Sequence, residues 1–466
     1  MTRFIALLTA VVLGCHWFLD IQPVQANQDA RPNIVLIMAD DLGWKDLHCY
    51  GNARLDTPAL DRLAAQGMRF TDAYAAAPVC SPTRAAIMTG QAPARIRLTN
   101  HAPGNPDRFS LEGSNLQEAE TVRHLSLSYV TLAERLSAAG YETAHVGKWH
   151  LSYVARGNQQ VSEPDLRPEH QGFDINIGGC FRGGPPSYFA PYRIPTLKAK
   201  QPGEYLPERL ADEAIDFIRQ ERDRPFFLNW WPYSVHYPME ARKALIEKYR
   251  QRKGPGIKNP VYAAMIEAMD TEIGRFLKAL DDAGLTDNTL VIFKSDNGGY
   301  DGDNRPLRGM KGMLYEGGIR IPWFVRWPGK IKPGSICSVP IISTDCHPTI
   351  LEAVGLSPTP NQPMDGTSLI PLLTGKAQLE RDSLFFHYPN YAFHKRNRMG
   401  GVVREGPFKL IKRYGDGSLE LYNLTTDIQE GNNLATQLPE QARRLERKLD
   451  NWLRETGAKM PVRGTD

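Results

Sequence analysis

Apolar residues along the chain follow two alternating patterns, one typical of buried strands and one of amphipathic helices. Residues 33–38 form a continuous apolar, β-branched run, which predicts a strand buried on both faces. The next segment, DTPALDRLAAQG, has the start and the glycine stop of a helix. The same order of helix, glycine and apolar strand recurs at residues 131–150, 208–234 and 264–299. This alternation predicts an α/β fold with a large doubly wound sheet, parallel or mixed.

The pattern changes near residue 375. Two short strand-like runs in PFKLIKRYGDGSLELYNL are joined by the turn sequence GDG at 415–417, which predicts a hairpin. In PEQARRLERKLDNWLRE, apolar residues recur at helical spacing. We therefore expect a large catalytic domain over residues 31–374 and a smaller C-terminal α+β domain, an antiparallel sheet plus a helix, over residues 375–466.

The first 26 residues have the pattern of an export signal. Arg3 precedes an uncharged apolar run over residues 4–19, and VQA at 24–26 offers a small-residue cleavage site. The run is short for a membrane span, so we expect a periplasmic or secreted protein without a stable span. The segment VLGC also resembles, imperfectly, a lipoprotein processing site at Cys15, and simple cleavage near Ala26 is the favoured alternative.

Composition narrows the class of protein further. The 466 residues are 41% hydrophobic, enough for a large core, and the net charge of +4 argues against a nucleic-acid surface. Export implies an oxidising compartment. Apart from Cys15 and Cys80, four cysteines remain, which could pair in three ways or stay free thiols: Cys49, Cys180, Cys337 and Cys346.

Polar side chains follow four of the predicted strands, at the edge where an open parallel sheet binds its ligands. They are Asp40 and Asp41, then Lys148 and His150, then His236, then Asp296 and Asn297. One such pair is more often a turn or a helix cap, but four strand ends of this kind form a constellation. The carboxylate and amide oxygens suit Ca²⁺ or Mg²⁺ and not a soft metal.

One cysteine lies in an unusual setting, CSPTRAAIMTG at 80–90. CSPTR matches the C-x-P-x-R signature of type I sulfatases, which are formylglycine-dependent members of the alkaline phosphatase superfamily. NIVLIMADDLGW, GKWHLS, HYP, SDNGG and RGMKGMLYEGG fall in the order of that family. The chain thus resembles these sulfatases over nearly its whole mature length, and the resemblance implies the alkaline phosphatase-like sulfatase fold.

The resemblance also implies the chemistry. A maturation enzyme, either formylglycine-generating or anaerobic sulfatase-maturating, would convert Cys80 to 3-oxoalanine (formylglycine), whose hydrate attacks sulfur with one oxygen and expels sulfate through the other. One Ca²⁺, with Mg²⁺ less favoured, would be held by Asp40, Asp41, Cys80, Asp296 and Asn297. Lys148 and Lys311 would hold sulfate oxygens, and Arg84 would steady the diol. His236 with Lys311 would protonate the leaving alcohol, and His150 would take the remaining diol proton.

Two aromatic and basic loops, GGCFRGGPPSYFAPY and HYPNYAFHKRNR, resemble those of bacterial polysaccharide sulfatases and N-acetylgalactosamine sulfatases. From them and from one further histidine we predict a leaving-group pocket lined by His101, Arg182, Tyr188, His387, Tyr391 and His394. The expected substrate is a sulfated carbohydrate, such as a galactose or N-acetylgalactosamine sulfate.

Two other functions are alternatives to the sulfatase interpretation. A phosphonate monoester or phosphodiester hydrolase of the same superfamily would favour two metals, and only one acidic cluster is visible. An inactive sulfated-glycan binding protein would need a broken motif, and every motif residue is present.

Overall fold

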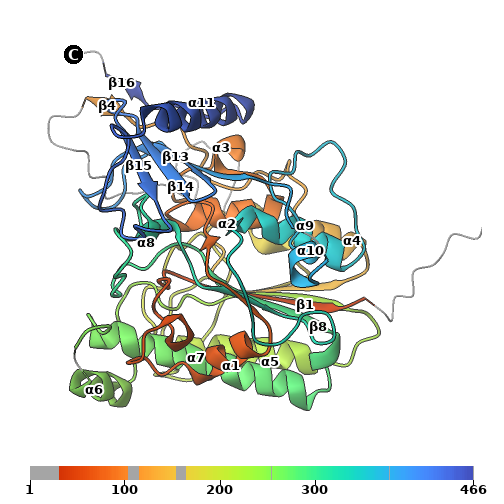
Figure 1. The fold of residues 1–466 in the computed structure, drawn as a ribbon. Helices are drawn as coiled ribbons and strands as arrows, with labels where there is room; N and C mark the ends of the chain where they lie inside the picture. The colour runs from red at the N-terminus through yellow and green to blue at the C-terminus, as the bar shows by residue number, and fades with distance from the viewer. Residues whose placement is uncertain (1–30, 103–114, 154–163, 253, 377, 465–466) are drawn as a thin grey trace, which may run out of the picture.

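The structure is a computed structural model that describes residues 31–102, 115–153, 164–252, 254–376 and 378–464 (Figure 1). The predicted signal segment at 1–26, with Cys15, lies outside the described residues.

The centre of the molecule is an eight-stranded sheet in the order β10-β2-β9-β8-β1-β7-β5-β6. β1 lies in the middle, parallel to both of its neighbours, and only β9 runs antiparallel to the strands beside it. The strands are β1 (Asn33–Ala39), β2 (Met68–Phe70), β5 (Glu142–Gly147), β6 (Ile175–Ile177), β7 (Phe226–Trp231), β8 (Thr289–Ser295), β9 (Trp323–Arg326) and β10 (Ser335–Cys337). The prediction of a large mixed sheet in an α/β fold is confirmed.

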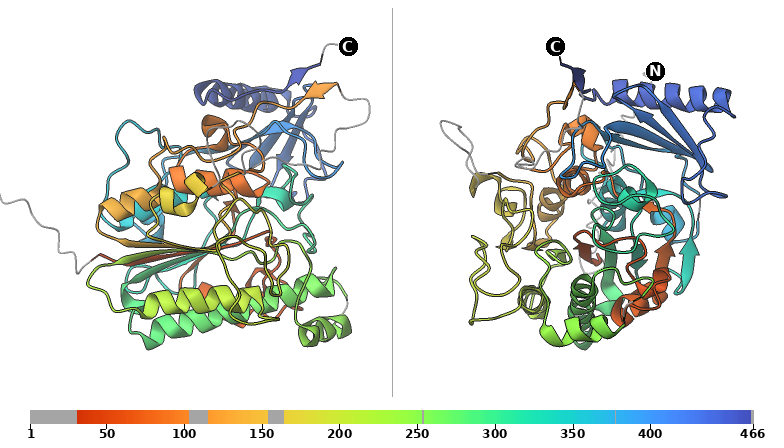
Figure 2. Two further views of the ribbon diagram at one scale, coloured as in Figure 1. Left: turned by 180° about the vertical axis from the view of Figure 1, so that it is seen from behind. Right: turned by 90° about the vertical axis from the view of Figure 1, so that its left-hand side faces the viewer.

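Helices cover both faces of this sheet (Figures 1 and 2). One layer holds α1 (Pro58–Ala65), α5 (Leu206–Arg219), α6 (Lys243–Gln251) and α7 (Pro260–Asp282). The other holds α2 (Cys80–Thr89), α4 (Leu132–Ala138), α9 (Cys346–Ala353) and α10 (Ile370–Leu373). Alternate residues of β1 enter the two cores: Val35 and Ile37 pack on the α5 and α7 side, and Ile34 and Leu36 on the α2 and α4 side. This double burial explains the continuous apolar run at residues 33–38.

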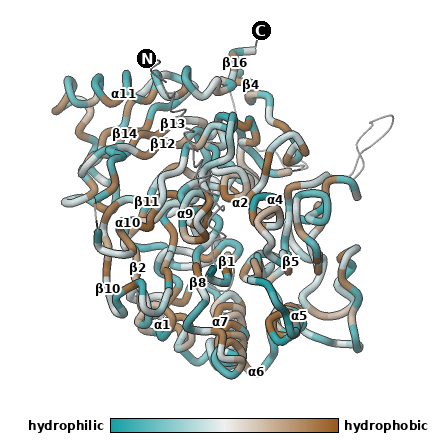
Figure 3. Tube along the Cα trace, turned by 90° about the vertical axis from the view of Figure 1, so that its right-hand side faces the viewer, coloured by the Kyte–Doolittle hydropathy of each residue, from teal (hydrophilic) through white to brown (hydrophobic). Residues whose placement is uncertain are grey.

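The C-terminal part is a four-stranded antiparallel sheet, β12 (Ser383–Tyr388), β13 (Gly400–Glu405), β14 (Phe408–Arg413) and β15 (Leu419–Asn423). The predicted GDG turn joins β14 to β15. α11 (Pro439–Glu455) packs Leu445, Leu449 and Leu453 on one sheet face, and its trace alternates between hydrophilic and hydrophobic colours (Figure 3). The other face contacts the large part, with Val402 and Ile411 in one core with Tyr74 and Val79.

The remaining elements are short. They are β3 (Ala73–Tyr74), β4 (Leu116–Gln117), β11 (Ile341–Ile342) and β16 (Val462–Arg463), with α3 (Pro93–Ile96), α8 (Glu316–Ile319), and the 3-10 turns η2 (His48–Tyr50), η3 (Pro164–Leu166), η4 (Pro168–His170), η5 (Thr286–Asn288) and η6 (Ser343–Asp345). β4 pairs with β16, so a segment near residue 116 is tied to the C-terminal end.

Two open points of the sequence are answered within the described residues. The cysteines at positions 49, 80, 180, 337 and 346 are all free thiols, so the possible disulfide pairings are not formed. No helix in this part of the chain has the length and apolar character to cross a membrane.

Candidate active site

The strand register brings the predicted ligands together at one edge of the sheet. Ala39 of β1 pairs with Ser295 of β8 in parallel register, so the next residues, Asp40 and Asp296, emerge side by side. On the other side of β1, Gly147 at the end of β5 pairs with Trp231 at the end of β7, and Lys148 follows directly. Cys80 is the first residue of α2, at the end of that helix where its N–H groups are free. The expectation that these strand ends share one site is met by this register.

Four side chains form the acidic centre of the site. Asp40, Asp41, Cys80 and Asp296 each offer one ligand atom, and these atoms lie within 4.8 Å of one another. The Cys80 Sγ lies 3.6 Å from the Oδ1 of Asp40 and 3.9 Å from the Oδ1 of Asp41. Asp41 has a φ of 64°, a left-handed conformation that Asp tolerates better than most residues, and its N–H donates to the Oδ1 of Asp296 at 3.1 Å. The turn after β1 therefore directs both carboxylates at the cysteine.

Three buried cations pair with the three carboxylates. The Nζ of Lys148 lies 2.7 and 2.9 Å from the carboxylate oxygens of Asp40, and the Nζ of Lys311 lies 2.6 and 2.8 Å from those of Asp41. Arg84 donates from Nη2 to the Oδ2 of Asp296 at 2.6 Å, and its Nη1 donates to the carbonyl of Lys148 at 3.0 Å. Arg84 thus sits behind the carboxylates and holds their geometry.

Burial and these neighbours set the charges of the site. Burial raises the pKa of Asp40 to about 8, against the lowering effect of Lys148. Burial also acts to raise the pKa of Asp296. The positive charges of Arg84 and Lys148 outweigh this effect, and the pKa of Asp296 lies below its usual value. Burial disfavours the charged Lys311, yet Asp41 raises the pKa of this ammonium above its usual range. A further cation would relieve the crowding of three buried carboxylates.

The hydrogen bonds of Asn297 show whether these side chains could coordinate such a cation. Its Nδ2 donates to the Oδ1 of Asp41 at 2.8 Å and to the carbonyl of Gly298 at 3.0 Å. Its Oδ1 is buried and has no hydrogen-bond partner among the described residues. Buried polar atoms are normally satisfied, and an amide oxygen beside three carboxylates is a ligand set for a hard divalent cation. The residues therefore fit a single Ca²⁺ or Mg²⁺.

Two histidines border the acidic centre. The Nδ1 of His236 lies 2.9 Å from the carbonyl of Tyr237, which can only accept, so Nδ1 carries the proton and Nε2 is the free nitrogen, 3.7 Å from the Oδ2 of Asp41. Burial and then Lys311 lower the pKa of His236 to about 3. Burial and then Lys148 hold the pKa of His150 well below its usual value. Both rings are neutral in this arrangement.

Ser81 and a glycine pair support these histidines, and neither was predicted from the sequence. The Oγ of Ser81 donates to the carbonyl of His150 at 2.8 Å and accepts from the N–H of Ala102 at 3.0 Å. A Cβ at Gly183 would lie 2.7 Å from the Cε1 of His150, and one at Gly184 would lie 2.6 Å from the Nδ1 of His236. The adjacent glycines in FRGGPP were the sequence signal for this close approach.

Two of the six residues predicted for the leaving-group pocket contact residues of the site, and a third, Arg182, is linked to it through its neighbour Gly183. The ring of His101 is 5.9 Å from that of His150, and the Nε2 of His394 lies 2.7 Å from the carbonyl of Lys311. Arg182 directly precedes Gly183, and its guanidinium lies 5.2 Å from the ring centre of Phe181.

The other three residues are engaged inside the fold. Tyr188 is fully buried, and its hydroxyl donates to the carbonyls of Tyr233 and His236, so it supports the His236 loop from within. His387 is buried between Tyr414 and the carbonyl of Lys459 in the C-terminal part. The hydroxyl of Tyr391 donates to the carbonyl of Leu116 at 2.7 Å. These three side chains make hydrogen bonds within the fold, and the composition of the loops did not distinguish them from residues that face the site.

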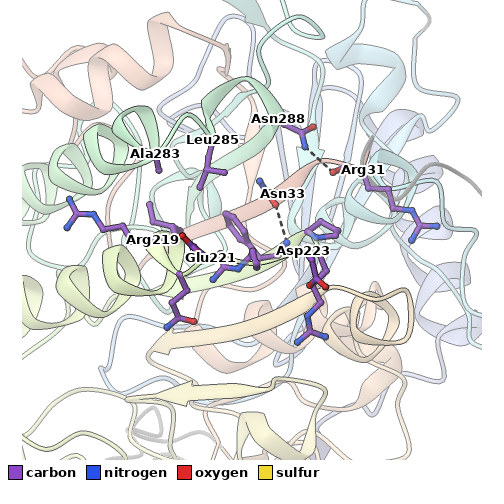
Figure 4. A pocket seen from close by; sticks show the side chains of 14 residues that line it. Arg31, Asn33, Arg219, Glu221, Asp223, Ala283, Leu285 and Asn288 are labelled. Atoms are coloured by element: carbon purple, nitrogen blue, oxygen red, sulfur yellow. Dashed lines mark hydrogen bonds between the residues drawn. The ribbon is translucent and has the colours of Figure 1, made fainter.

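A surface pocket of about 630 Å³ lies elsewhere, at the amino ends of the strands (Figure 4). It is lined by Asn33 and Phe226, the first residues of β1 and β7, and by Asn288, which precedes β8. None of the predicted catalytic or metal-binding residues lines it.

The fold and the site define a hydrolase of the alkaline phosphatase-like α/β class. Residues 32–356 match the Sulfatase family model, and residues 310–459 match the model for N-sulphoglucosamine sulphohydrolase, C-terminal. The chain belongs to the sulfatase family, and it is a sulfuric ester hydrolase.

Relatives support this assignment along most of the chain. A sulfatase of Formosa agariphila is 32% identical, covering 93% of this chain and 91% of that protein. Arylsulfatase A of Homo sapiens is 36% identical, covering 81% of this chain and 74% of that protein. The crystal structure of Ps i-CgsB has a TM-score of 0.77 at 27% identity, covering 91% of this chain and 93% of that one.

Proposed function

We propose that this sulfatase removes O-sulfate from a sulfated carbohydrate, using formylglycine at position 80 and one bound Ca²⁺. The observation that carries the proposal is the position of Cys80, which starts α2 within the C-x-P-x-R segment and lies fully buried among three carboxylates and three cations. A carbohydrate substrate is supported by relatives: Ps i-CgsB is also known in complex with k-i-k-neocarrahexaose, and N-acetylgalactosamine-6-sulfatase of Homo sapiens is 32% identical over 76% of this chain.

Asp40, Asp41, Asp296 and Asn297 would hold the ion. When bound there, it would supply positive charge that favours the ionised form of a hydroxyl on residue 80 and offsets negative charge on the sulfuryl oxygens. Hydrated formylglycine would supply the nucleophilic hydroxyl that a thiol at this position cannot.

The chain's own cations bind and orient the ester. Lys148 and Lys311 are buried beside Cys80, and each now pairs with one carboxylate. An ion on those carboxylates would free both ammonium groups for the anionic sulfate oxygens, which they would hold in a site closed to water. Arg84 is pinned by Asp296 and by the carbonyl of Lys148, so it orients residue 80 and the carboxylates.

The two histidines move protons at opposite ends of the reaction. Because Nδ1 of His236 donates to the Tyr237 carbonyl, its Nε2 is the atom that can give a proton to the leaving alcohol. A bound sulfate adds negative charge beside this ring and favours its protonated form. Lys311 would act together with His236 in protonating the leaving alcohol. The Nδ1 of His150 is buried without a partner among the described residues, and this atom would take a proton from residue 80.

Cys80 is fully buried in the folded chain, so a maturation enzyme must act on it before folding is complete. We accordingly propose a formylglycine-generating or anaerobic sulfatase-maturating enzyme as a partner during export, and a periplasmic or secreted location for the mature chain.

A phosphodiester or phosphonate substrate is less favoured, because such an enzyme would favour two metals. Both candidate metal groups among the described residues share Asp41 and Cys80 and amount to one site.

The test is a combined mass and activity measurement on protein made with and without a maturation enzyme. We expect the peptide with residue 80 to lose sulfur and two hydrogens and gain one oxygen, and sulfate release from a panel of sulfated mono- and oligosaccharides to follow that modification. Chelation should abolish release, and Ca²⁺ should restore it better than Zn²⁺. Cys80→Ser should be inactive, whereas the matched thiol variant Cys49→Ser should stay active. Full activity with an unmodified Cys80, or after removal of all metal, would contradict the proposal.

A further inference from the structure

An aromatic cluster borders the site beside Lys311. It comprises Tyr237, Tyr300, Phe393 and His394, from the loops after β7, after β8 and between β12 and β13. Ring centres lie 5.9 Å apart for Tyr237 and Tyr300, 5.2 Å for Tyr300 and Phe393, and 4.8 Å for Phe393 and His394. Three separate segments therefore contribute to one continuous aromatic surface, which we call the aromatic rim.

The aromatic rim starts at the residues proposed for catalysis. Tyr237 directly follows His236, and the Nζ of Lys311 lies 5.6 Å from the centre of the Phe393 ring. Phe393 is 6.1 Å from His101, whose ring is in turn 5.9 Å from His150. The rim thus lies where the alcohol part of a sulfate ester must sit once its sulfate is held by the lysines.

These rings are partly open to solvent. Tyr237 is 45% exposed, and Tyr300 and Phe393 are partly exposed, although Phe393 also packs against the core that contains Tyr74 and Val79. Clustered aromatic faces left open to solvent beside a catalytic centre are typical of ligand-binding surfaces.

Two hydrogen-bond acceptors accompany the rim. The Nε2 of His394 lies 2.7 Å from the Lys311 carbonyl and so must carry the proton, which leaves Nδ1 as an acceptor. This Nδ1 and the Oδ2 of Asp301 are both buried and have no hydrogen-bond partner among the described residues. Asp301 directly follows Tyr300 and interacts with Tyr237, whose pKa is raised by burial and then by this carboxylate. Both atoms would pair with hydroxyl donors.

Resting on the proposed function, we infer that the aromatic rim binds the ring that carries the sulfate, that Asp301 and His394 accept hydrogen bonds from its hydroxyls, and that this ring is a sugar. A pyranose has an apolar face of C–H groups and hydroxyls around its edge, which matches an aromatic surface with acceptors beside it. A sterol or a simple aryl ring would also cover the aromatic faces, but it would leave both buried acceptors unpaired, which is unfavourable.

The experiment compares two substrates in matured, Ca²⁺-loaded protein: the best sulfated monosaccharide of the panel and 4-nitrophenyl sulfate. Asp301→Ala should lower kcat/KM on the sugar sulfate about 10- to 100-fold more than on the aryl sulfate, because only the sugar offers hydroxyls to this acceptor. Tyr300→Ala should raise KM for the sugar about 10-fold through lost ring contact, and Tyr300→Phe should restore it. Asp287→Ala, an exposed aspartate near the opposite end of β8, is the matched control.

The mass of residue 80 and the thermal unfolding of each variant show whether the catalytic centre and the fold are intact. Equal losses on both substrates, or a loss no larger than that of Asp287→Ala, would overturn the inference. Turnover of 4-nitrophenyl sulfate with no sugar sulfate hydrolysed would also overturn it, while leaving sulfatase chemistry in place. Absence of turnover on every sulfate ester by fully modified protein would instead contradict the proposed function.

Discussion

The backbone at Gly183 and Gly184 lies closer to the two catalytic histidine candidates than any side chain would permit. A Cβ at either position would lie 2.6–2.7 Å from an imidazole atom, well inside van der Waals contact. Neither residue has a positive φ, so the requirement for glycine comes from the rings and not from the backbone conformation. The pair therefore sets the positions of His150 and His236, which are proposed to move protons.

We predict that Gly183→Ala or Gly184→Ala lowers kcat on a sulfated monosaccharide, whose alcohol is a poor leaving group, about 100-fold, because a displacement near 1 Å is enough to disrupt proton transfer. Gly431→Ala is the control, since its Cβ would meet only the Oδ1 of Asp427 at 3.8 Å. Steady-state kinetics and thermal unfolding of the three variants are the measurements. An unchanged kcat in both loop variants would show that the histidines tolerate the shift.

At the scale of elements, a buried ion cluster fastens the C-terminal sheet to the catalytic part. The Nζ of Lys409 on β14 lies 2.9 Å from Glu316 at the start of α8 and 2.8 Å from Glu430, and all three side chains are fully buried. The hydroxyl of Tyr74 donates to the same Glu316 at 2.8 Å. Burial acts to raise the pKa of Glu316, but Lys409 and then Arg320 lower it to about 2. Because Glu316 follows Lys311 by five residues, this cluster also anchors the segment that carries Lys311.

Lys409→Met should destabilise the protein by about 3–5 kcal/mol, because it removes the cation paired with the buried Glu430 and one of the two cations paired with the buried Glu316. Lys412→Met on the same strand is the matched control: its ammonium is 22% exposed and pairs with Glu446 and Asp450, so its loss should cost less than about 1 kcal/mol. Urea unfolding of both variants measures the difference. Equal stabilities would mean that the cluster contributes no more than a surface ion pair.

At the scale of the whole molecule, neutral histidines are buried in three separate regions. Burial lowers the pKa of His145 on β5 to about 3, and those of His347 on α9 and His387 on β12 to about 4. The unfolded chain, with histidine pKa values near 6.5, binds more protons than the folded one in this range. Stability is therefore complete above a pH of about 6.5 and is lost as the pH falls toward about 4.

We predict that the free energy of unfolding falls by about 2 kcal/mol per buried histidine between pH 7 and pH 5. His387→Gln should remove one such contribution, so its unfolding free energy should change less over this range than that of the parent chain. His170→Gln, at an exposed site, is the control. The test is denaturant unfolding at pH 5, 6 and 7, and identical pH dependence in the parent and His387→Gln would refute the assignment.

The sequence by itself determined the order of helices and strands and pointed to the acidic, cationic and cysteine residues that the fold brings together at one edge of the sheet. Continuous apolar runs such as β1 must be buried on both faces, and parallel strands must end at one edge. A residue that directly follows such a strand, like Asp40 or Asp296, must therefore lie at that edge of the sheet. The membership of this cluster was therefore predictable from local pattern and from the family signature around Cys80.

Only the tertiary structure decided which aromatic residues of the loops face the site. Tyr188, His387 and Tyr391 were expected there and are engaged inside the fold, whereas Tyr237, Tyr300 and Phe393 form the aromatic rim. The free state of the cysteines and the reversed direction of β9 were decided at the same level. A loop side chain is placed by contacts with other segments, from 27 residues away for His387 and Tyr414 to 275 residues away for Tyr391 and Leu116, and no local periodicity records those contacts.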